Sequence, residues 1–157
     1  MKKTIFIATI FMIVPLLSNA QEDSQSEERQ QMYLSHLEEE GYRPTIDDDG
    51  DVKFKKEGKS YYIFDGPEKT FKIATYLALD EDQECSEELR WLINKYNKGR
   101  IIESAIIFEN CQTVGLYSSS HLARDDDWER IYQKATLWLK YASDDFFDQY
   151  AEWKEDK

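Results

Sequence analysis

The sequence predicts an α+β fold, in which helices pack against an antiparallel meander sheet of five or six strands. The expected order is helix, three or four strands, helix, two strands, helix. Apolar residues recur at helical spacing near the start, in the middle and at the end of the chain. Short segments rich in β-branched and aromatic residues lie between these stretches, separated by turns that contain glycine and aspartate. The chain of 157 residues is 14% aromatic, which is enough for one substantial core.

The first twenty residues have the composition of a secretory signal peptide. Lys2 and Lys3 precede an apolar stretch, residues 4–17, and residues 18–20 (Ser-Asn-Ala) form a small-x-small cleavage site. A bilayer requires about 20 consecutive apolar residues, so this shorter stretch is not expected to span a membrane. We therefore expect cleavage near Ala20 and an exported protein, either periplasmic or secreted.

After residues 1–20, the sequence predicts a lead-in and one domain. Residues 21–28 are rich in Ser, Gln and Glu without periodicity, which predicts a flexible lead-in. Residues 29–157 lie within the usual size of a single domain, roughly 100 to 200 residues. Tyr33 and Leu37 belong to a first helix, which we expect to end at a glycine, Gly41.

Four strands are expected next. Pro44 prevents the helix from continuing, and residues 45–46 and 52–55 flank an aspartate-rich turn. A second turn at Gly58 separates residues 52–55 from residues 60–64. The fourth strand, residues 70–79, alternates in a way that places one set of side chains on a single face: Phe71, Ile73, Thr75, Leu77 and Leu79.

The aspartate-rich turn, residues 47–51, invites comparison with a calcium loop. If Gly50 were the sixth residue of an EF-hand loop, Thr45 and Lys56 would occupy the first and twelfth places, where carboxylates are required. Turn formation by Asp and Gly explains the run instead. Two histidines and two cysteines, widely separated, give no zinc spacing either. No metal or cofactor is expected.

The second half predicts a helix, a hairpin and helical segments at the end. An apolar stripe marks the middle helix, which ends before Gly99: Leu89, Leu92, Ile93 and Tyr96. Residues 101–108 and 113–118 form a hairpin. Aspartates 125–127 are expected to cap a helix whose buried face is Trp128, Ile131, Tyr132, Ala135, Leu139 and Ala142. A further short helix is expected to begin at residues 143–145.

The C-terminal region is unusually aromatic. Trp138 and Tyr141 fall off the face set by Trp128 and Ala135, so we expect them to be exposed. Two explanations stay open, namely core packing of a long helix, or an exposed aromatic interface for a protein partner or a homodimer. The candidate interface residues are Trp138, Tyr141, Phe146, Phe147, Tyr150 and Trp153.

The two cysteines also leave two alternatives. The helix that starts near Cys85 rises about 1.5 Å per residue, and residues 101–109 return along a strand, so the turn with Cys111 comes back towards the helix start. Export and an even cysteine count favour a structural Cys85–Cys111 disulfide. The alternative is a buried Cys85 with a free thiol at Cys111.

Composition and motifs exclude some functions. With 20 basic and 32 acidic residues, a net charge of −12 makes nucleic acid an unsuitable partner. A serine hydrolase would have to use His121 with Ser118-Ser119-Ser120, but no Gly-x-Ser-x-Gly elbow is present and adjacent strand residues point to opposite faces. No catalytic residue is therefore assigned. His36 is expected at an exposed or edge position of the first helix.

Over residues 33–147 the layout resembles the YbjN family of bacterial sensory-transduction regulators, whose fold is similar to that of type III secretion chaperones. The resemblance is carried by the helix end at residues 37–42, the turn and strand at 47–54, residues 92–98 before a strand, and the final aromatic helix. It implies a sheet with helices against it, dimerisation and binding of protein segments. Type III secretion chaperones act in the cytoplasm, whereas this chain carries an export signal, so a role in loading that machine is not expected.

The sequence thus favours an exported, non-enzymatic protein-binding module of chaperone-like or regulator-like type. Two alternatives from other classes stay open. One is an envelope hydrolase that uses a pair of surface carboxylates. The other is an acidic inhibitor or immunity-type protein that blocks a basic target through its charge.

Overall fold

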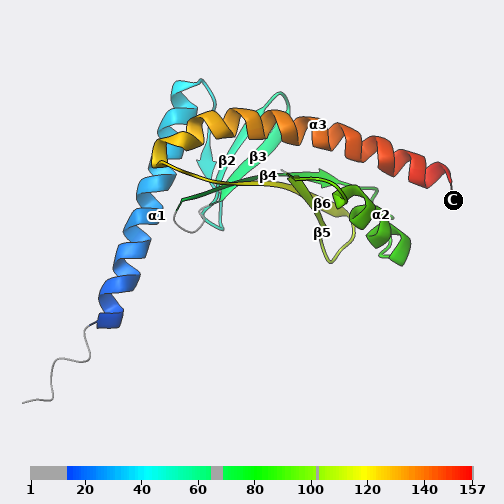
Figure 1. Ribbon diagram of the computed structural model, residues 1–157, viewed down its shortest axis with the longest axis horizontal. Helices are drawn as coiled ribbons and strands as arrows, with labels where there is room; N and C mark the ends of the chain where they lie inside the picture. Colours follow the sequence, from blue (N-terminus) through cyan, green and yellow to red (C-terminus); the bar gives the residue numbers. More distant parts are fainter. Residues whose placement is uncertain (1–13, 65–68, 102, 157) are drawn as a thin grey trace, which may run out of the picture.

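The computed structural model describes residues 14–64, 69–101 and 103–156. In these ranges the chain forms a six-stranded antiparallel sheet with three α-helices, in the order α-β-β-β-β-α-β-β-α (Figure 1). The predicted fold class is confirmed. No helix within the described ranges is both long and apolar enough to cross a membrane.

The sheet has the strand order β1-β2-β3-β4-β6-β5. The first four strands form a meander: β1 (Thr45–Ile46), β2 (Val52–Lys56), β3 (Lys59–Phe64) and β4 (Thr70–Ala78). β5 (Glu103–Ile107) and β6 (Thr113–His121) form the second hairpin, and β6 pairs with β4. β6 continues three residues beyond the predicted end at Ser118 because it pairs along the whole of β4, up to Thr70 opposite His121.

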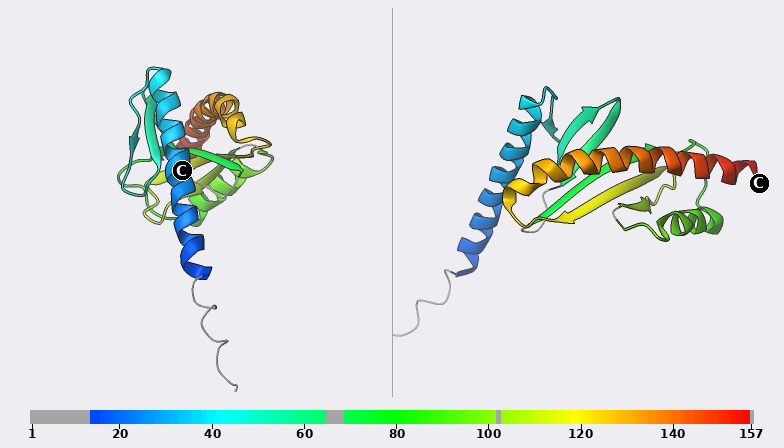
Figure 2. Two further views of the ribbon diagram at one scale, coloured as in Figure 1. Left: turned by 90° about the vertical axis from the view of Figure 1, so that its left-hand side faces the viewer. Right: turned by 45° about the horizontal axis from the view of Figure 1, so that its top comes forward.

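The three helices are α1 (Val14–Glu39), α2 (Glu87–Asn97) and α3 (Trp128–Glu155). α3 lies along one face of the sheet, α1 crosses one end of it, and α2 lies near the other end (Figures 1 and 2). The predicted stripe of α2 is buried, and Ser86 caps its start by accepting a hydrogen bond from the backbone N–H of Leu89.

One residue joins α1, α3 and the sheet. The Trp128 side chain is fully buried, with its ring centroid 4.7 Å from that of Tyr33 in α1 and 6.1 Å from that of Phe71 in β4. Tyr33 and Leu37 of α1 are buried in the same cluster. The core therefore lies between the helices and one face of the sheet, which we call the core face.

Residues 21–28, for which the sequence predicts a flexible lead-in, are part of α1. The segment holds neither Pro nor Gly, and its Gln and Glu residues favour helices. Residues 1–13, the first part of the expected signal peptide, lie outside the described residues. The signal peptide stays a prediction.

The predicted break at residues 143–145 is wrong, because α3 is one continuous helix of 28 residues. The Ser143 side chain is buried, and its hydroxyl donates a 2.7 Å hydrogen bond to the Leu139 carbonyl one turn earlier instead of capping a new helix. The aspartates at 125–127 form a 3₁₀ turn before α3, and the Asp127 carboxylate accepts from the Arg124 N–H at 3.0 Å.

The edge strand β5 is partly covered by a side chain of α2. Asn97 donates from Nδ2 to the Ala105 carbonyl at 2.8 Å and accepts from the Ala105 N–H at 2.7 Å. Exposed backbone groups on a sheet edge are a template for pairing with another strand. At Ala105 the Asn97 amide takes the place of such a strand.

Candidate functional site

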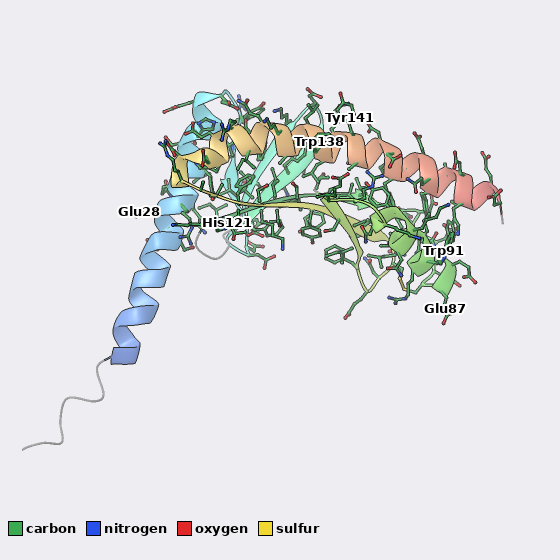
Figure 3. All side chains as sticks on the ribbon, in the orientation of Figure 1. Glu28, Glu87, Trp91, His121, Trp138 and Tyr141 are labelled. Atoms are coloured by element: carbon green, nitrogen blue, oxygen red, sulfur yellow. A yellow bond between two sulfur atoms is a disulfide. The ribbon has the colours of Figure 1, made fainter. Side chains whose placement is uncertain are left out.

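Three large apolar residues of α3 form an exposed ridge. Leu137, Trp138 and Tyr141 are 50%, 46% and 57% exposed, and we call them the α3 ridge. They adjoin one another because residues one turn apart lie on the same side of a helix. Leu139 and Ala142, on the other side, are buried in the core. In Figure 3 Trp138 and Tyr141 lie on the part of α3 turned away from the sheet.

The other four candidate interface residues divide differently from the prediction. Phe146 and Tyr150 belong to the core, so they are not available to a partner. Trp153 is partly buried and stacks on Tyr150 at 5.7 Å between ring centroids, whereas Phe147 is 39% exposed. The reason is the continuity of α3, since an unbroken helical period carries residues 146 and 150 onto the core face.

A shallow hollow of about 660 Å³ lies between the first turns of α2 and the end of α3. It is lined by Glu87, Glu88, Arg90, Trp91, Asn94 and Trp153. Trp91 is 60% exposed, and the Lys95 ammonium lies 5.2 Å from the centre of its ring. The two glutamates stand in the first turn of α2, where negative charge stabilises the helix dipole. This explains their presence without a ligand.

The face of the sheet opposite the core carries a cluster of aromatic rings that the sequence analysis did not single out. We call this surface the open face. The centroid of the Tyr76 ring lies 4.9 Å from that of Tyr62, 5.6 Å from that of Phe108 and 6.3 Å from that of Tyr117. Phe64 extends the cluster, at 5.9 Å from Tyr117. The sequence could have predicted this cluster, because its strands carry aromatic residues at alternate positions that face away from the predicted core face.

The open face also differs in charge from the rest of this acidic chain. The Lys72 ammonium lies 5.0 Å from the Phe64 ring centre and 4.9 Å from that of Tyr117, and Lys53 lies 5.2 Å from that of Tyr62. Among the described strand residues, none whose side chain points to this face is Asp or Glu. Aromatic rings and lysines therefore define its chemistry.

A hollow of about 310 Å³ opens on this face between two turns. Tyr62, Tyr76 and Thr113 line it from strands β3, β4 and β6. Phe108 and Asn110 line it from the β5–β6 connection. Its other side is the β1–β2 turn, which contributes three carboxylates: Asp47, Asp49 and Asp51.

These carboxylates bear on the hydrolase alternative. The Asp47 Oδ1 atom accepts from the backbone N–H groups of Asp49 and Asp51, at 3.1 and 2.9 Å, so Asp47 holds the turn together. Glycoside hydrolysis requires two carboxyl groups on opposite sides of the bond that breaks. Here the three carboxylates belong to one turn, so they lie on the same side of the hollow. No observation on this hollow favours glycoside hydrolysis.

The two histidines lie on different elements, His36 on α1 and His121 on β6. His121 is exposed at the end of β6, and Ser118 and His121 face opposite sides of the sheet. His36 lies at the junction of α1 and α3, with Nε2 3.5 Å from Glu40 and Nδ1 3.6 Å from Glu129. Among the described residues, no group of three or more His, Cys, Asp or Glu side chains is placed to hold a metal ion.

Glu40 is part of the same junction. Burial alone would raise its pKa, but hydrogen bonds from Tyr132 and Gln133, with the nearby charges of His36 and Lys56, hold the pKa below its usual value. The carboxylate thus stays ionised and links α1 to α3. The junction has a structural role.

Cys85 and Cys111 form a disulfide, with 5.2 Å between their Cα atoms. The sequence left open a disulfide or two free cysteines, and the structure contains the disulfide. Cys85 stands just before α2, and Cys111 is fully buried in the β5–β6 turn. The bond fastens the start of α2 to the turn beside the open-face hollow.

Several buried tyrosines predict how the protein responds to alkali. Burial raises the pKa of Tyr61, Tyr96 and Tyr150 to about 12, with a hydrogen bond to Asp80 contributing at Tyr150. A tyrosine in an unfolded chain ionises near pH 10. The stability that these groups contribute is therefore complete below about pH 10 and is lost as the pH rises from about 10 to 12.

Absorbance at 295 nm, followed together with circular dichroism, checks this prediction. We expect only part of the ten tyrosines to ionise before the fold is lost, and the rest to ionise with unfolding. Ionisation of all ten near pH 10 in a protein that keeps its native spectrum would contradict it.

Comparison with known proteins assigns no family. No protein-family model and no curated protein matches this sequence. The resemblance to the YbjN family depends on the layout of helices and strands, and it stays a prediction. Function is therefore best inferred from the exposed surfaces.

Proposed function

We propose that this chain is an exported, non-enzymatic protein-binding module of chaperone-like or regulator-like type, and that it holds a protein segment against the α3 ridge. The observation that carries the proposal is the exposure of Leu137, Trp138 and Tyr141 side by side on a helix whose other side forms the core. Single exposed apolar residues are ordinary, but adjoining ones mark interaction sites. Trp and Tyr are also the residues that most often dominate binding energy.

The surroundings of the ridge suit a protein partner. Lys140 lies 5.6 Å from the Tyr141 ring centre and 3.5 Å from the Asp144 carboxylate, which also pairs with Lys59 at 3.3 Å. An apolar centre with a charged rim is the usual arrangement of a protein interface. The ridge stands on a helix fixed by its buried side, so little ordering is needed on binding.

Replacing Trp138 and Tyr141 by Ala tests the proposal. Capture of partners by the immobilised protein from native envelope should fall, because burying such a side chain contributes roughly 1.5 to 3 kcal/mol. The circular dichroism spectrum should not change. Asp148→Ala with Glu152→Ala, two exposed positions of the same helix, is the matched control. Undiminished capture, or loss of folding in the Trp138/Tyr141 variant, would contradict a role for the ridge in binding.

Export is part of the proposal, and it predicts a defined N-terminus. Cleavage after Ala20 leaves Gln21 as the first residue, within α1. N-terminal sequencing or intact mass of the protein purified from its native envelope should therefore begin at Gln21. Native material that retains Met1 would overturn the export proposal.

A further inference from the structure

We infer that the open-face hollow binds a small solute that carries a quaternary ammonium group. Three aromatic rings and three carboxylates line this hollow together. Enclosure by aromatic rings is the means by which proteins commonly recognise quaternary ammonium ligands. The inference goes beyond the proposed function, because the hollow lies on the face of the sheet opposite the core and its ligand is not a protein.

The three rings of the hollow form adjoining walls. The centroids of the Tyr62 and Tyr76 rings lie 4.9 Å apart with 64° between the ring planes, and those of Tyr76 and Phe108 lie 5.6 Å apart with 71°. Rings set at such angles surround a space instead of forming one flat stack. A cation within about 6 Å of a ring centre is attracted by the negative charge density of the ring face. Three rings around one hollow therefore offer a cation several such contacts.

Two lysines of this chain show that rings of the same cluster attract cations. The Lys72 ammonium lies 4.9 Å from the centre of the Tyr117 ring, and the Lys53 ammonium lies 5.2 Å from that of Tyr62. Tyr76 contacts both of these rings, at 6.3 Å from Tyr117 and 4.9 Å from Tyr62. No lysine or arginine in the described part of the chain lies over Tyr76 itself. A cation from solution can take that place.

The charge of the hollow is complementary to a cation. Asp47, Asp49 and Asp51 line one side of it, whereas a single ammonium, that of Lys53, lies over a lining ring of the described chain. After burial and hydrogen bonding, the charge of Asp51 is a further cause of the raised pKa of Tyr76, so this carboxylate acts on the Tyr76 hydroxyl. The net charge of −12 on the whole chain also draws cations from solution.

The carboxylates favour a quaternary ammonium over a primary ammonium or a metal ion. One of their oxygens, Asp47 Oδ1, already accepts from the backbone N–H groups of Asp49 and Asp51. A primary ammonium brings three N–H donors that require new acceptors on binding, whereas a quaternary ammonium brings none. Among the described residues, these three carboxylates included, no group is placed to hold a metal ion. A cation that requires only rings and a negative field therefore fits the hollow best.

The walls of the hollow are held in place on both sides. Gln30 of α1 donates from Nε2 to the Gly50 carbonyl at 2.7 Å, which fixes the β1–β2 turn. The Phe108 N–H donates to the Thr113 carbonyl at 3.0 Å, and the disulfide at Cys111 fastens the same connection to the start of α2. Walls that are already ordered lower the entropic cost of binding. The volume, about 310 Å³, is at the lower end for ligand sites, which indicates a small ligand.

Calorimetric titration of the full exported chain with choline chloride tests the inference. Choline should bind saturably, and its neutral isostere, in which a tert-butyl group replaces the trimethylammonium group, should bind at least about tenfold more weakly. Phe108→Leu, which keeps an apolar side chain but removes the ring, and Asp49→Asn should each weaken choline binding at least about threefold.

Phe147→Leu and Asp48→Asn are the matched controls, and neither should alter the affinity for choline. Phe147 is 39% exposed, as Phe108 is, but lies on α3. Asp48 belongs to the same turn as Asp49 but does not line the hollow. Circular dichroism confirms folding, and Asp49→Asn, at an exposed turn position, supplies the test if Phe108→Leu does not fold.

Several results would overturn the inference. Without saturable binding, or with equal affinity for choline and its isostere, the hollow has no site for a cation. Tighter binding of butylammonium than of choline would assign the carboxylates to a primary ammonium. Sedimentation of the protein with phosphatidylcholine vesicles would point to a lipid surface instead of a free solute. Choline binding that Phe108→Leu and Asp49→Asn both leave unchanged lies elsewhere.

The test is independent of the proposed role of the α3 ridge. The variant with Trp138→Ala and Tyr141→Ala should bind choline as the wild type does, because these residues belong to the helix on the core face. Choline binding that this variant loses would place the site on the ridge and contradict the assignment to the hollow.

Discussion

Replacing both Cys85 and Cys111 by serine is expected to lower the free energy of unfolding by about 3 to 4 kcal/mol. The two residues are 26 positions apart in sequence, and closing a loop of that length restricts the unfolded chain by about this amount. Urea unfolding of the variant at neutral pH, beside wild type with and without reductant, gives the measurement.

Hydrogen exchange shows where the stability is lost. The bridge holds the start of α2, and the Asn97 amide holds its end against β5. Without the bridge, the amides of the first turns of α2 should exchange faster than those of β4, which lies at the centre of the sheet. Equal stability of the serine variant and the oxidised wild type would show that the bridge contributes nothing to the fold.

Trp128→Ala is expected to destabilise the fold by about 3 to 5 kcal/mol, the usual range for a fully buried large aromatic side chain. The ring lies against Tyr33 and His36 of α1 and Phe71 of β4, so its removal loosens the attachment of α1. Thermal and urea unfolding measure the loss, and limited proteolysis of α1 locates it.

Trp138→Ala is the matched control, on the same helix and of the same residue type. Its side chain is 46% exposed, so we expect a change within about 0.5 kcal/mol. Similar losses from both substitutions would place Trp138 in the core and remove it from the binding surface. The contrast therefore tests the difference between the two sides of α3.

Local patterns predicted the sheet and α2 well. The alternation of residues 70–79 gave the buried face of β4, because each strand side chain points opposite to its neighbours. Asp and Gly at the β1–β2 turn, and the stripe from Leu89 to Tyr96, depend on interactions within a few residues of one another. Such interactions can be read from the sequence.

Features that depend on distant residues were harder to predict. The sequence around Ser143 is typical of a helix cap. In the structure the Ser143 hydroxyl is buried and donates a hydrogen bond to the Leu139 carbonyl, and α3 continues through this position. That continuity carries Phe146 and Tyr150 inward, which aromatic content alone did not indicate. The open-face cluster is assembled from rings on three strands and on the β5–β6 connection, so its contacts follow from strand order and register rather than from any one segment.

Site-specific photocrosslinking tests the proposed protein-binding role of the α3 ridge most directly. Benzoylphenylalanine would replace Tyr141, which is 57% exposed on the ridge, and in a second variant would replace Asp148 on the same helix. Illumination of cells that export each variant should give a discrete adduct with another protein from position 141 and little or none from position 148. An equal pattern from both positions, or no adduct from position 141, would contradict binding at the ridge.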